Sequence, residues 1–132
     1  MTTMTVELRN VPGTEAALGV AGGHTLVVDR PEGMAGGMGL GFNGGQLLAL
    51  ALGGCFCNDL RTVAHEMGVA LTTISVSVGI EVEGAPLLTK SATMTVVCET
   101  ADGADPAPVI ARTRAISMVA NTLQRGVAVT VR

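Results

Sequence analysis

An alternation of apolar and polar residues with a period of two is the feature that most restricts the fold of this chain. It runs through residues 74–83, where apolar side chains occupy every second position: Ile74, Val76, Val78, Ile80 and Val82. A short turn, Gly84-Ala85-Pro86, leads to residues 88–98, which alternate in the same way. This period predicts strands with one buried face, and two strands joined by so short a turn must pair antiparallel.

Two segments have helical periodicity instead. Residues 46–67 form the longer one, whose first half is apolar on every side, which predicts burial all round, and whose second half gains a polar face. Gly68 fits the position just past its end. The second helix is predicted to begin at Asp105-Pro106, a capping carboxylate followed by proline, and to end at Gly126. Its predicted core stripe consists of Val109, Ile116, Ala120 and Leu123.

The remaining segments complete an α+β chain. Residues 4–9 and 24–29 are predicted strands, and residues 30–45 are a predicted glycine-rich loop. Residues 127–131, with valine at every second position, are a predicted closing strand. The predicted order is β-β-α-β-β-α-β in a single domain, 1–132, with antiparallel sheets packed on the long buried helix.

The composition excludes several classes of protein. Hydrophobic residues make up 48% of the chain and charged residues 14%, which is the opposite of a disordered chain. Eight basic residues against eleven acidic ones, with no basic cluster, argue against nucleic acid as a partner. A small domain of this composition has more apolar surface than it can bury alone, so we expect a homodimer.

Insertion into a membrane is the other way to bury this apolar surface, and the sequence does not favour membrane insertion. The longest uncharged apolar run, residues 47–57, has 11 residues, whereas about 20 are needed to span a bilayer. No basic segment with a cleavage site opens the chain, and the three cysteines lack the spacing of a disulfide framework. We therefore expect a reducing, cytoplasmic location.

One segment stands out for its chemistry: Gly53-Gly54-Cys55-Phe56-Cys57, inside the predicted buried helix. A free cysteine there behaves first of all as a small hydrophobic residue. Cys55 and Cys57 point about 200° apart on a helix, so they cannot chelate one metal ion. Asp59, one turn after Cys55, opposes a thiolate there. Arg61 stands one turn after Cys57 and favours a thiolate at that position, so local charge favours Cys57 as the reactive thiol.

Two other patterns carry less weight. Gly39-Leu40-Gly41-Phe42-Asn43-Gly44 has the glycine spacing of a dinucleotide site, but such a site requires a strand directly upstream and a parallel βαβ unit. Neither is predicted here, so we expect no cofactor. His24, Asp29 and Glu32 lie near the glycine-rich loop without the spacing of a ligand set, and we expect solvated surface residues.

Taken together, these motifs resemble the OsmC/Ohr family of osmotically inducible and organic-hydroperoxide-resistance proteins. The resemblance covers residues from about 24 to 132. It is carried by Asp29-Arg30-Pro31, Asn43-Gly44-Gly45-Gln46-Leu47-Leu48, the Ala-Leu-Gly-Gly-Cys motif that ends at Cys55, and Ser117-Met118-Val119-Ala120-Asn121-Thr122-Leu123.

The resemblance implies an intertwined homodimer with two thiol sites at the subunit interface. In active members, a cysteine on a helix attacks a hydroperoxide and becomes a sulfenic acid. A second cysteine then closes a disulfide, which a dithiol such as a lipoyl group reduces. An apolar pocket would favour alkyl hydroperoxides over hydrogen peroxide.

Carried over residue by residue, the resemblance assigns Cys55 as the cysteine that attacks the peroxide. The family's second cysteine falls on Ser117, its glutamate on Gly45, and its arginine on Arg9. These departures make the chain a divergent member. A serine cannot resolve a sulfenic acid, so the cycle implied here uses one cysteine and an external thiol.

Two functions remain open. The first is reduction of organic hydroperoxides at Cys55, with Cys57 or Cys98 as alternative resolving thiols, although the side chains of Cys55 and Cys57 diverge on a helix. The second, suggested by Gly45 and Ser117, is an inactive family member whose dimer binds a small apolar or thiol-reactive ligand in the interface pocket.

Overall fold

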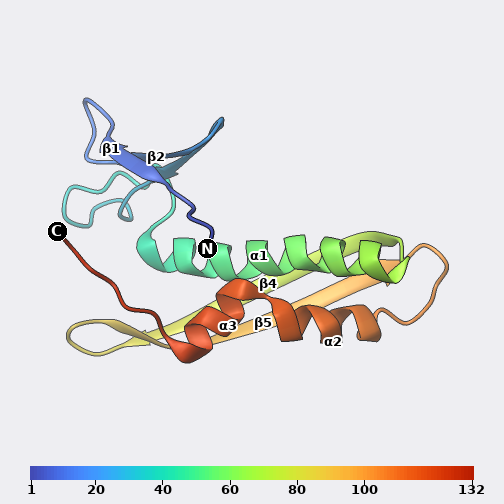
Figure 1. Ribbon diagram of the computed structural model, residues 1–132. Coiled ribbons are helices and arrows are strands. Elements are labelled where there is room, and N and C mark those ends of the chain that lie inside the picture. Colours follow the sequence, from blue (N-terminus) through green and yellow to red (C-terminus); the bar gives the residue numbers. More distant parts are fainter. The chain divides into compact units, whose positions relative to one another are not determined.

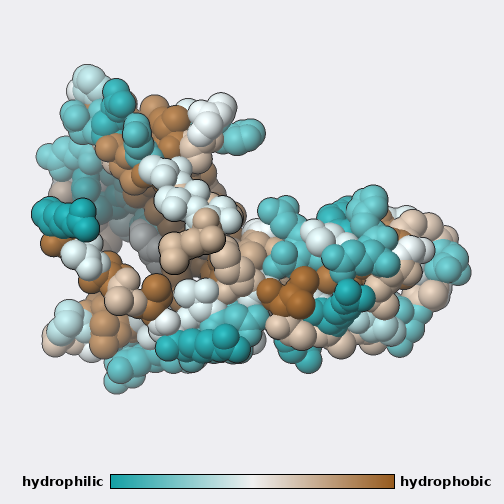
Figure 2. All heavy atoms as spheres, in the orientation of Figure 1, coloured by the Kyte–Doolittle hydropathy of each residue, from teal (hydrophilic) through white to brown (hydrophobic).

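The computed structural model describes residues 1–132 and consists of two antiparallel sheets and three helices (Figure 1). The elements follow in the order β1 (Glu7–Asn10), β2 (Ala17–Ala21), β3 (His24–Val28), α1 (Gly44–Met67), β4 (Leu71–Glu83), β5 (Leu88–Thr100), α2 (Ala107–Ile116) and α3 (Met118–Arg125). Two compact units divide the chain, Met1–Leu47 and Leu48–Arg132, which we call the N-terminal and C-terminal units. Hydrophobic side chains reach the surface on the face drawn in Figure 2. The predicted α+β class is confirmed.

β4 and β5 form the antiparallel hairpin that the sequence predicts. Val76 pairs with Val96 and Val78 with Met94, so these apolar side chains share one face. The opposite face is exposed and carries mostly serine, threonine and glutamate. Because successive side chains of a strand point to opposite faces, the period of two in the sequence becomes one apolar and one polar face.

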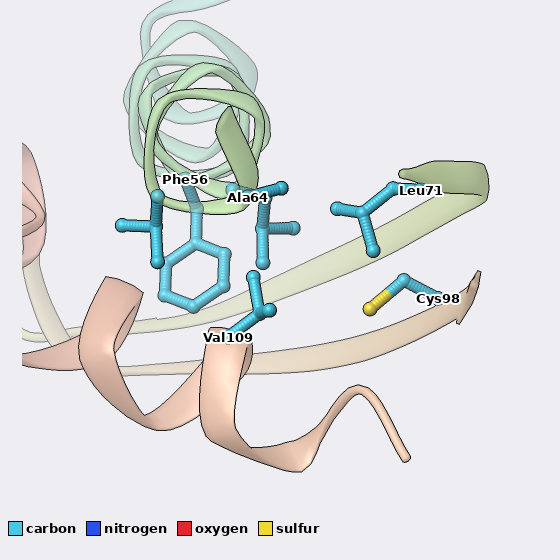
Figure 3. Packing of buried hydrophobic residues seen from close by; sticks show 7 residues of the cluster. Phe56, Ala64, Leu71, Cys98 and Val109 are labelled. Atoms are coloured by element: carbon cyan, nitrogen blue, oxygen red, sulfur yellow. The ribbon is translucent and has the colours of Figure 1, made fainter. Parts of the chain in front are cut away.

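α1 packs a buried stripe of residues against the apolar face of the hairpin. The stripe consists of Leu52, Gly53, Phe56, Leu60, Val63 and Ala64. Phe56 of α1 and Val109 of α2 point toward one another within the same core (Figure 3). A Cβ atom on Gly53 would lie 2.9 Å from Val78 Cγ2, so glycine permits the close approach of helix and strand at this point.

Polar side chains and glycines mark the ends of the helices. The Gln46 N–H donates to Asn43 Oδ1 at 2.9 Å, and the Asn43 N–H donates to Gln46 Oε1 at 3.0 Å, a reciprocal capping box. α1 therefore begins at Gly44, two residues earlier than predicted, and it ends before Gly68, which has φ +67°. Asp105 Oδ1 accepts the N–H of Ala107 at 2.9 Å, but the N-cap is Pro106, so α2 begins one residue later than predicted.

The second predicted helix is interrupted at Ser117 and becomes α2 and α3. Ser117 has φ −60° and ψ 115°, while its N–H still donates to the Thr113 carbonyl at 2.9 Å. One non-helical residue changes the rotational phase of all residues that follow it. The predicted continuous core stripe is wrong: Val109 is buried, but Leu123, after the break, is exposed, and so is Ile116 before it.

Other boundaries also differ from the prediction. The first strand begins at Glu7 instead of residue 4, and β2 was missed although the two-residue turn Gly22-Gly23 that joins it to β3 is a hairpin signal. Residues 127–131 form no strand, because they pair with no strand of this chain. The first half of α1 is not buried all round: Leu50 is 44% exposed, since the buried stripe covers only one side of the helix.

α1 is long and apolar enough to cross a membrane, judged by length and composition alone, with a mean hydropathy of 1.3 over its most apolar 18 residues. The core helix of a water-exposed domain satisfies the same test. The buried stripe that faces the hairpin identifies α1 as such a core helix of the C-terminal unit.

In the N-terminal unit, the glycine-rich loop folds back onto the end of β3 around Asp29. This side chain is 1% exposed, so the prediction of a solvated surface residue is wrong for it. Its Oδ2 accepts the N–H groups of Met38 at 3.0 Å and Leu40 at 3.1 Å, and its Oδ1 accepts the N–H of Arg30 at 2.8 Å. The bond from Leu40 is the main cause that lowers the pKa of Asp29. The free-energy cost of burying this carboxylate is therefore compensated by the backbone N–H groups of the loop that it holds in place.

Replacing Asp29 by asparagine should release the loop. Because folding lowers the pKa of Asp29, its carboxylate stabilises the loop above the unfolded value of about 3.8 and loses this effect as the pH falls through the folded value. In the wild type, the Met38 and Leu40 amides should be protected from hydrogen exchange at neutral pH and lose protection in strong acid. In D29N they should be weakly protected at both. Glu32→Gln in the same loop is the control, and unchanged protection in D29N would contradict the role of Asp29.

Candidate functional site

Cys55 lies on α1 at the border of the buried stripe, directly before Phe56. Successive residues of a helix are rotated by about 100°, so a neighbour of a buried position is only partly covered, and the Cys55 side chain is half-buried. Its thiol donates to Asp59 Oδ2 at 3.4 Å, one helical turn later. The helix that carries the sulfur therefore also orients it.

The second partner of this sulfur comes from a distant part of the sequence. Ser117, at the break between α2 and α3, is completely buried, and its hydroxyl donates to Cys55 Sγ at 3.7 Å. The side-chain amide of Asn121 holds the break by donating to the Ser117 carbonyl at 2.8 Å and to the Ala115 carbonyl at 3.3 Å. Sequence reasoning missed Asn121, because nothing in Ala-Ile-Ser-Met signals a break in a helix. The structure thus brings together the two residues that the resemblance assigns to the attacking and resolving positions.

The chemistry of this pair follows from its donors and acceptors. The sulfur has one acceptor, the Asp59 carboxylate, and one donor, the Ser117 hydroxyl, and neither partner is a cation. A fixed hydroxyl donor can stabilise negative charge on the sulfur, or an oxygen atom that becomes bound to it. The site is therefore suited to hold an oxidised sulfur, but it contains no second thiol with which to close a disulfide.

The other candidate thiols lie outside this pair. Cys57 is half-buried, and the Arg61 guanidinium, whose charge favours a thiolate there by sequence spacing, donates to the Leu71 carbonyl at 2.7 Å instead. Cys98 belongs to the hydrophobic core, beside Leu71 in Figure 3, and burial raises the pKa of its thiol. All three cysteines are free.

The two remaining residues that the resemblance assigns lie in the N-terminal unit. Arg9 is exposed on β1 opposite Leu18, so its role at the thiol site stays a prediction. Gly45 is the second residue of α1 and supplies no carboxylate.

The structure shows no set of residues arranged to bind a metal ion or a dinucleotide. No group of three or more His, Cys, Asp or Glu side chains is placed to hold a metal ion. The glycines between residues 39 and 44 precede a helix that leads into an antiparallel hairpin, so they do not belong to the parallel βαβ unit that a dinucleotide site requires.

A separate cleft of about 760 Å³ lies between α1, the hairpin and the two C-terminal helices. Its walls are mostly apolar and include Leu52 and Phe56 of α1. Cys55 and Ser117 are not among its lining residues, although Phe56, the next residue after Cys55, is.

The arrangement of a long cysteine-bearing helix on an antiparallel hairpin, with a broken helix facing the cysteine, is an OsmC-like fold. The sequence profile of the OsmC-like protein family matches residues 36–132, so the chain belongs to this family. The resemblance seen in the sequence is thereby confirmed. A comparison with curated proteins gives no match.

Solved structures show the same fold at low sequence identity. An OsmC-like protein from Mycoplasma pneumoniae has a TM-score of 0.76 at 13% identity, over 93% of this chain and 88% of that one. The organic hydroperoxide resistance protein OsmC from Legionella pneumophila has a TM-score of 0.65 at 17% identity, over 94% and 90%. The organic hydroperoxide resistance protein OhrB of Bacillus subtilis has a TM-score of 0.61 at 21% identity, over 93% and 91%.

Replacing Ser117 by cysteine should supply the missing resolving thiol. Because the Ser117 oxygen lies 3.7 Å from the Cys55 sulfur, a sulfur at this position needs only a small shift to reach disulfide distance. One equivalent of cumene hydroperoxide should convert S117C to a form with a disulfide between Cys55 and the introduced cysteine, detected by mass spectrometry as the loss of two hydrogens and by peptide mapping. Ser117→Ala is the control that cannot form it. Oxidation of S117C without this bond would show that the two positions do not face each other.

Proposed function

We propose that the protein is a homodimeric, thiol-dependent reductase of organic hydroperoxides that uses Cys55 as its nucleophile and an external thiol as its reductant. The observation that carries this proposal is the contact between the Cys55 sulfur and the Ser117 hydroxyl, the two residues to which the resemblance assigns the family's cysteines. Membership of the OsmC-like family and the names of two structural neighbours, both organic hydroperoxide resistance proteins, support it.

In the proposed cycle, the Cys55 thiolate attacks the terminal oxygen of R–O–OH. The O–O bond breaks, the alkoxide takes up a proton and leaves as an alcohol, and the sulfur becomes a sulfenic acid. An external thiol displaces water from this sulfur to give a mixed disulfide. A second thiol, or the other arm of a dithiol, then releases Cys55 and leaves as the oxidised disulfide. A reducing cytoplasm, which keeps thiols free, suits this cycle.

Residues around the sulfur have separate tasks in this cycle. Asp59 accepts the hydrogen bond of the thiol and would fix the orientation of the sulfur before attack. Ser117 donates to the sulfur and would hold the sulfenic oxygen after attack. Arg9 would supply the cation, as the resemblance implies, without the carboxylate that Gly45 replaces.

The second candidate function is binding without turnover. The observation that favours it is the mostly apolar cleft of about 760 Å³, which has a size typical of small-molecule sites. A family member with Gly45 and Ser117 in place of the glutamate and second cysteine could keep such a site after the redox chemistry is lost.

Two observations support the homodimer. Twenty large hydrophobic side chains are exposed, more than the nine hydrophobic residues that are buried. Among the exposed ones, Val127, Val129 and Val131 are 72%, 82% and 92% exposed, respectively, and lie in a segment with the alternation of a strand but no partner strand. We propose that residues 127–131 pair with a sheet edge of the second subunit, which would supply the missing partner.

The peroxidase proposal predicts that activity depends on one thiol. Wild-type protein should consume cumene hydroperoxide with dihydrolipoamide as reductant, and Cys55→Ser should lower kcat/KM by roughly 100-fold or more, because a hydroxyl is a far weaker nucleophile. Cys57→Ser is the matched control on the same helix and should keep its activity. No consumption by the wild type, or equal rates for C55S, would remove this proposal.

The dimer proposal predicts that a charge in the exposed tail weakens assembly. Wild-type protein should sediment as a dimer at micromolar concentration. Val129→Asp should shift it toward the monomer, because the aspartate would have to be buried in the interface. Thr130→Asp, on the opposite face of the same segment, should have a smaller effect. A wild-type monomer at this concentration would contradict the proposal.

A further inference from the structure

Cys55 is held by two hydrogen bonds of opposite sense, and both lie within one chain. Its thiol donates to Asp59 Oδ2 at 3.4 Å, and the completely buried Ser117 donates to its sulfur at 3.7 Å. Asp59 is half-buried and forms no ion pair within the chain. Because Asp59 lies one turn after Cys55 on the same helix, this contact does not depend on a second subunit. The site thus presents a carboxylate acceptor and a hydroxyl donor to any oxygen atom bound to the sulfur.

These two partners match a neutral sulfenic acid. In the S–O–H group that forms at Cys55 in the proposed cycle, the hydroxyl can donate to the Asp59 carboxylate, while its oxygen accepts from Ser117. An ionised sulfenate, S–O⁻, has no hydrogen to donate to Asp59 and is repelled by its negative charge. The Ser117 hydroxyl can donate to the oxygen in either form. Asp59 is therefore the residue that discriminates between the two forms.

The protonation state of the sulfenic acid decides which reaction follows. A sulfenate attacks the terminal oxygen of a second R–O–OH: the O–O bond breaks, the proton of that oxygen passes to the alkoxide, which leaves as an alcohol, and Cys55 becomes a sulfinate. An external thiol instead attacks the sulfur of the neutral acid, forms an S–S bond and releases water. Thiols do not reverse the sulfinate, so its formation ends the cycle. With serine at position 117, the sulfenic acid has to wait for an external thiol.

We infer that Asp59 directs the oxidised Cys55 toward reduction by a thiol and away from further oxidation to the sulfinate. The inference rests on the proposed peroxidase function. The charge of Asp59 disfavours both anions on the path to loss, the sulfenate that reacts and the sulfinate that forms. The same charge opposes the thiolate that attacks the first hydroperoxide, so Asp59 favours a long-lived enzyme over a fast one.

Asp59→Asn tests this inference, because the amide has nearly the same shape, lacks the charge and offers an N–H donor to a sulfenate. The quantity measured is the number of cumyl alcohol molecules formed for each Cys55 lost as sulfinate, at fixed concentrations of cumene hydroperoxide and dihydrolipoamide. Chromatography gives the alcohol, and mass spectrometry gives the gain of two oxygens at Cys55. Because both fates start from the sulfenic acid, this number does not depend on the rate of the first step. It should fall roughly tenfold in D59N.

Two further variants separate the charge of Asp59 from its structural role. Asp59→Glu keeps the charge and should stay close to the wild type, whereas a loss of packing at this position would affect both substitutions. Glu66→Gln removes a carboxylate almost two turns later on the same helix and should leave the number unchanged, because its charge is distant, exposed and screened. Thermal unfolding checks that all three variants are folded.

The outcomes distinguish this inference from the peroxidase proposal. An equal number of turnovers in D59N and the wild type, or an equal fall in D59N and E66Q, would overturn the role of Asp59 and leave the peroxidase function intact. Absence of alcohol formation by the wild type would remove both.

Discussion

The contact between the buried stripe of α1 and the apolar face of the β4–β5 hairpin is the interaction on which the C-terminal unit depends. The hairpin can hide its apolar face only against another element, and α1 can hide only one side of its surface there. Gly53 lets the two approach closely at Val78. This packing also sets the exposure of Cys55, because a residue next to Phe56 on a helix whose rotation is fixed must lie at the border of the core. The chemistry of the sulfur is thus a consequence of how the helix is packed.

The break at Ser117 is the second element of the site, and it has a cost that the structure compensates locally. Interrupting a helix leaves backbone groups without their usual partners. Here the N–H of Ser117 still reaches Thr113, and Asn121 bonds the carbonyl groups of Ser117 and Ala115. Ser117 continues the buried face of α2 at an interval of four residues from Thr113, and its hydroxyl donates to the Cys55 sulfur.

Local signals made part of this fold predictable. The alternation in residues 74–98 specified the hairpin, and Gly68 and Asp105 marked helix ends, because each acts over a few residues of its own neighbourhood. The break at Ser117 and the burial of Asp29 depend on partners far along the chain or across a loop, which no local pattern records. The valines after residue 126 show a related limit. Their alternation is typical of a strand, but the segment forms no strand in this chain, because a strand forms only where a partner strand exists.

The same dependence on a partner extends to the proposed chemistry. Within the C-terminal unit, the sulfur of Cys55 has a carboxylate and a hydroxyl as partners, and the cations Arg61 and Arg112 are bound to Leu71 and Glu66. A nucleophilic thiolate is favoured by a nearby cation, and in this unit neither of these arginines is free to provide it. Arg9, which forms no ion pair, lies in the N-terminal unit. If Arg9 is the cation of the proposed reaction, as the resemblance implies, it comes from outside the unit that carries the sulfur. Assembly becomes a condition for catalysis if that arginine comes from the second subunit of the proposed homodimer.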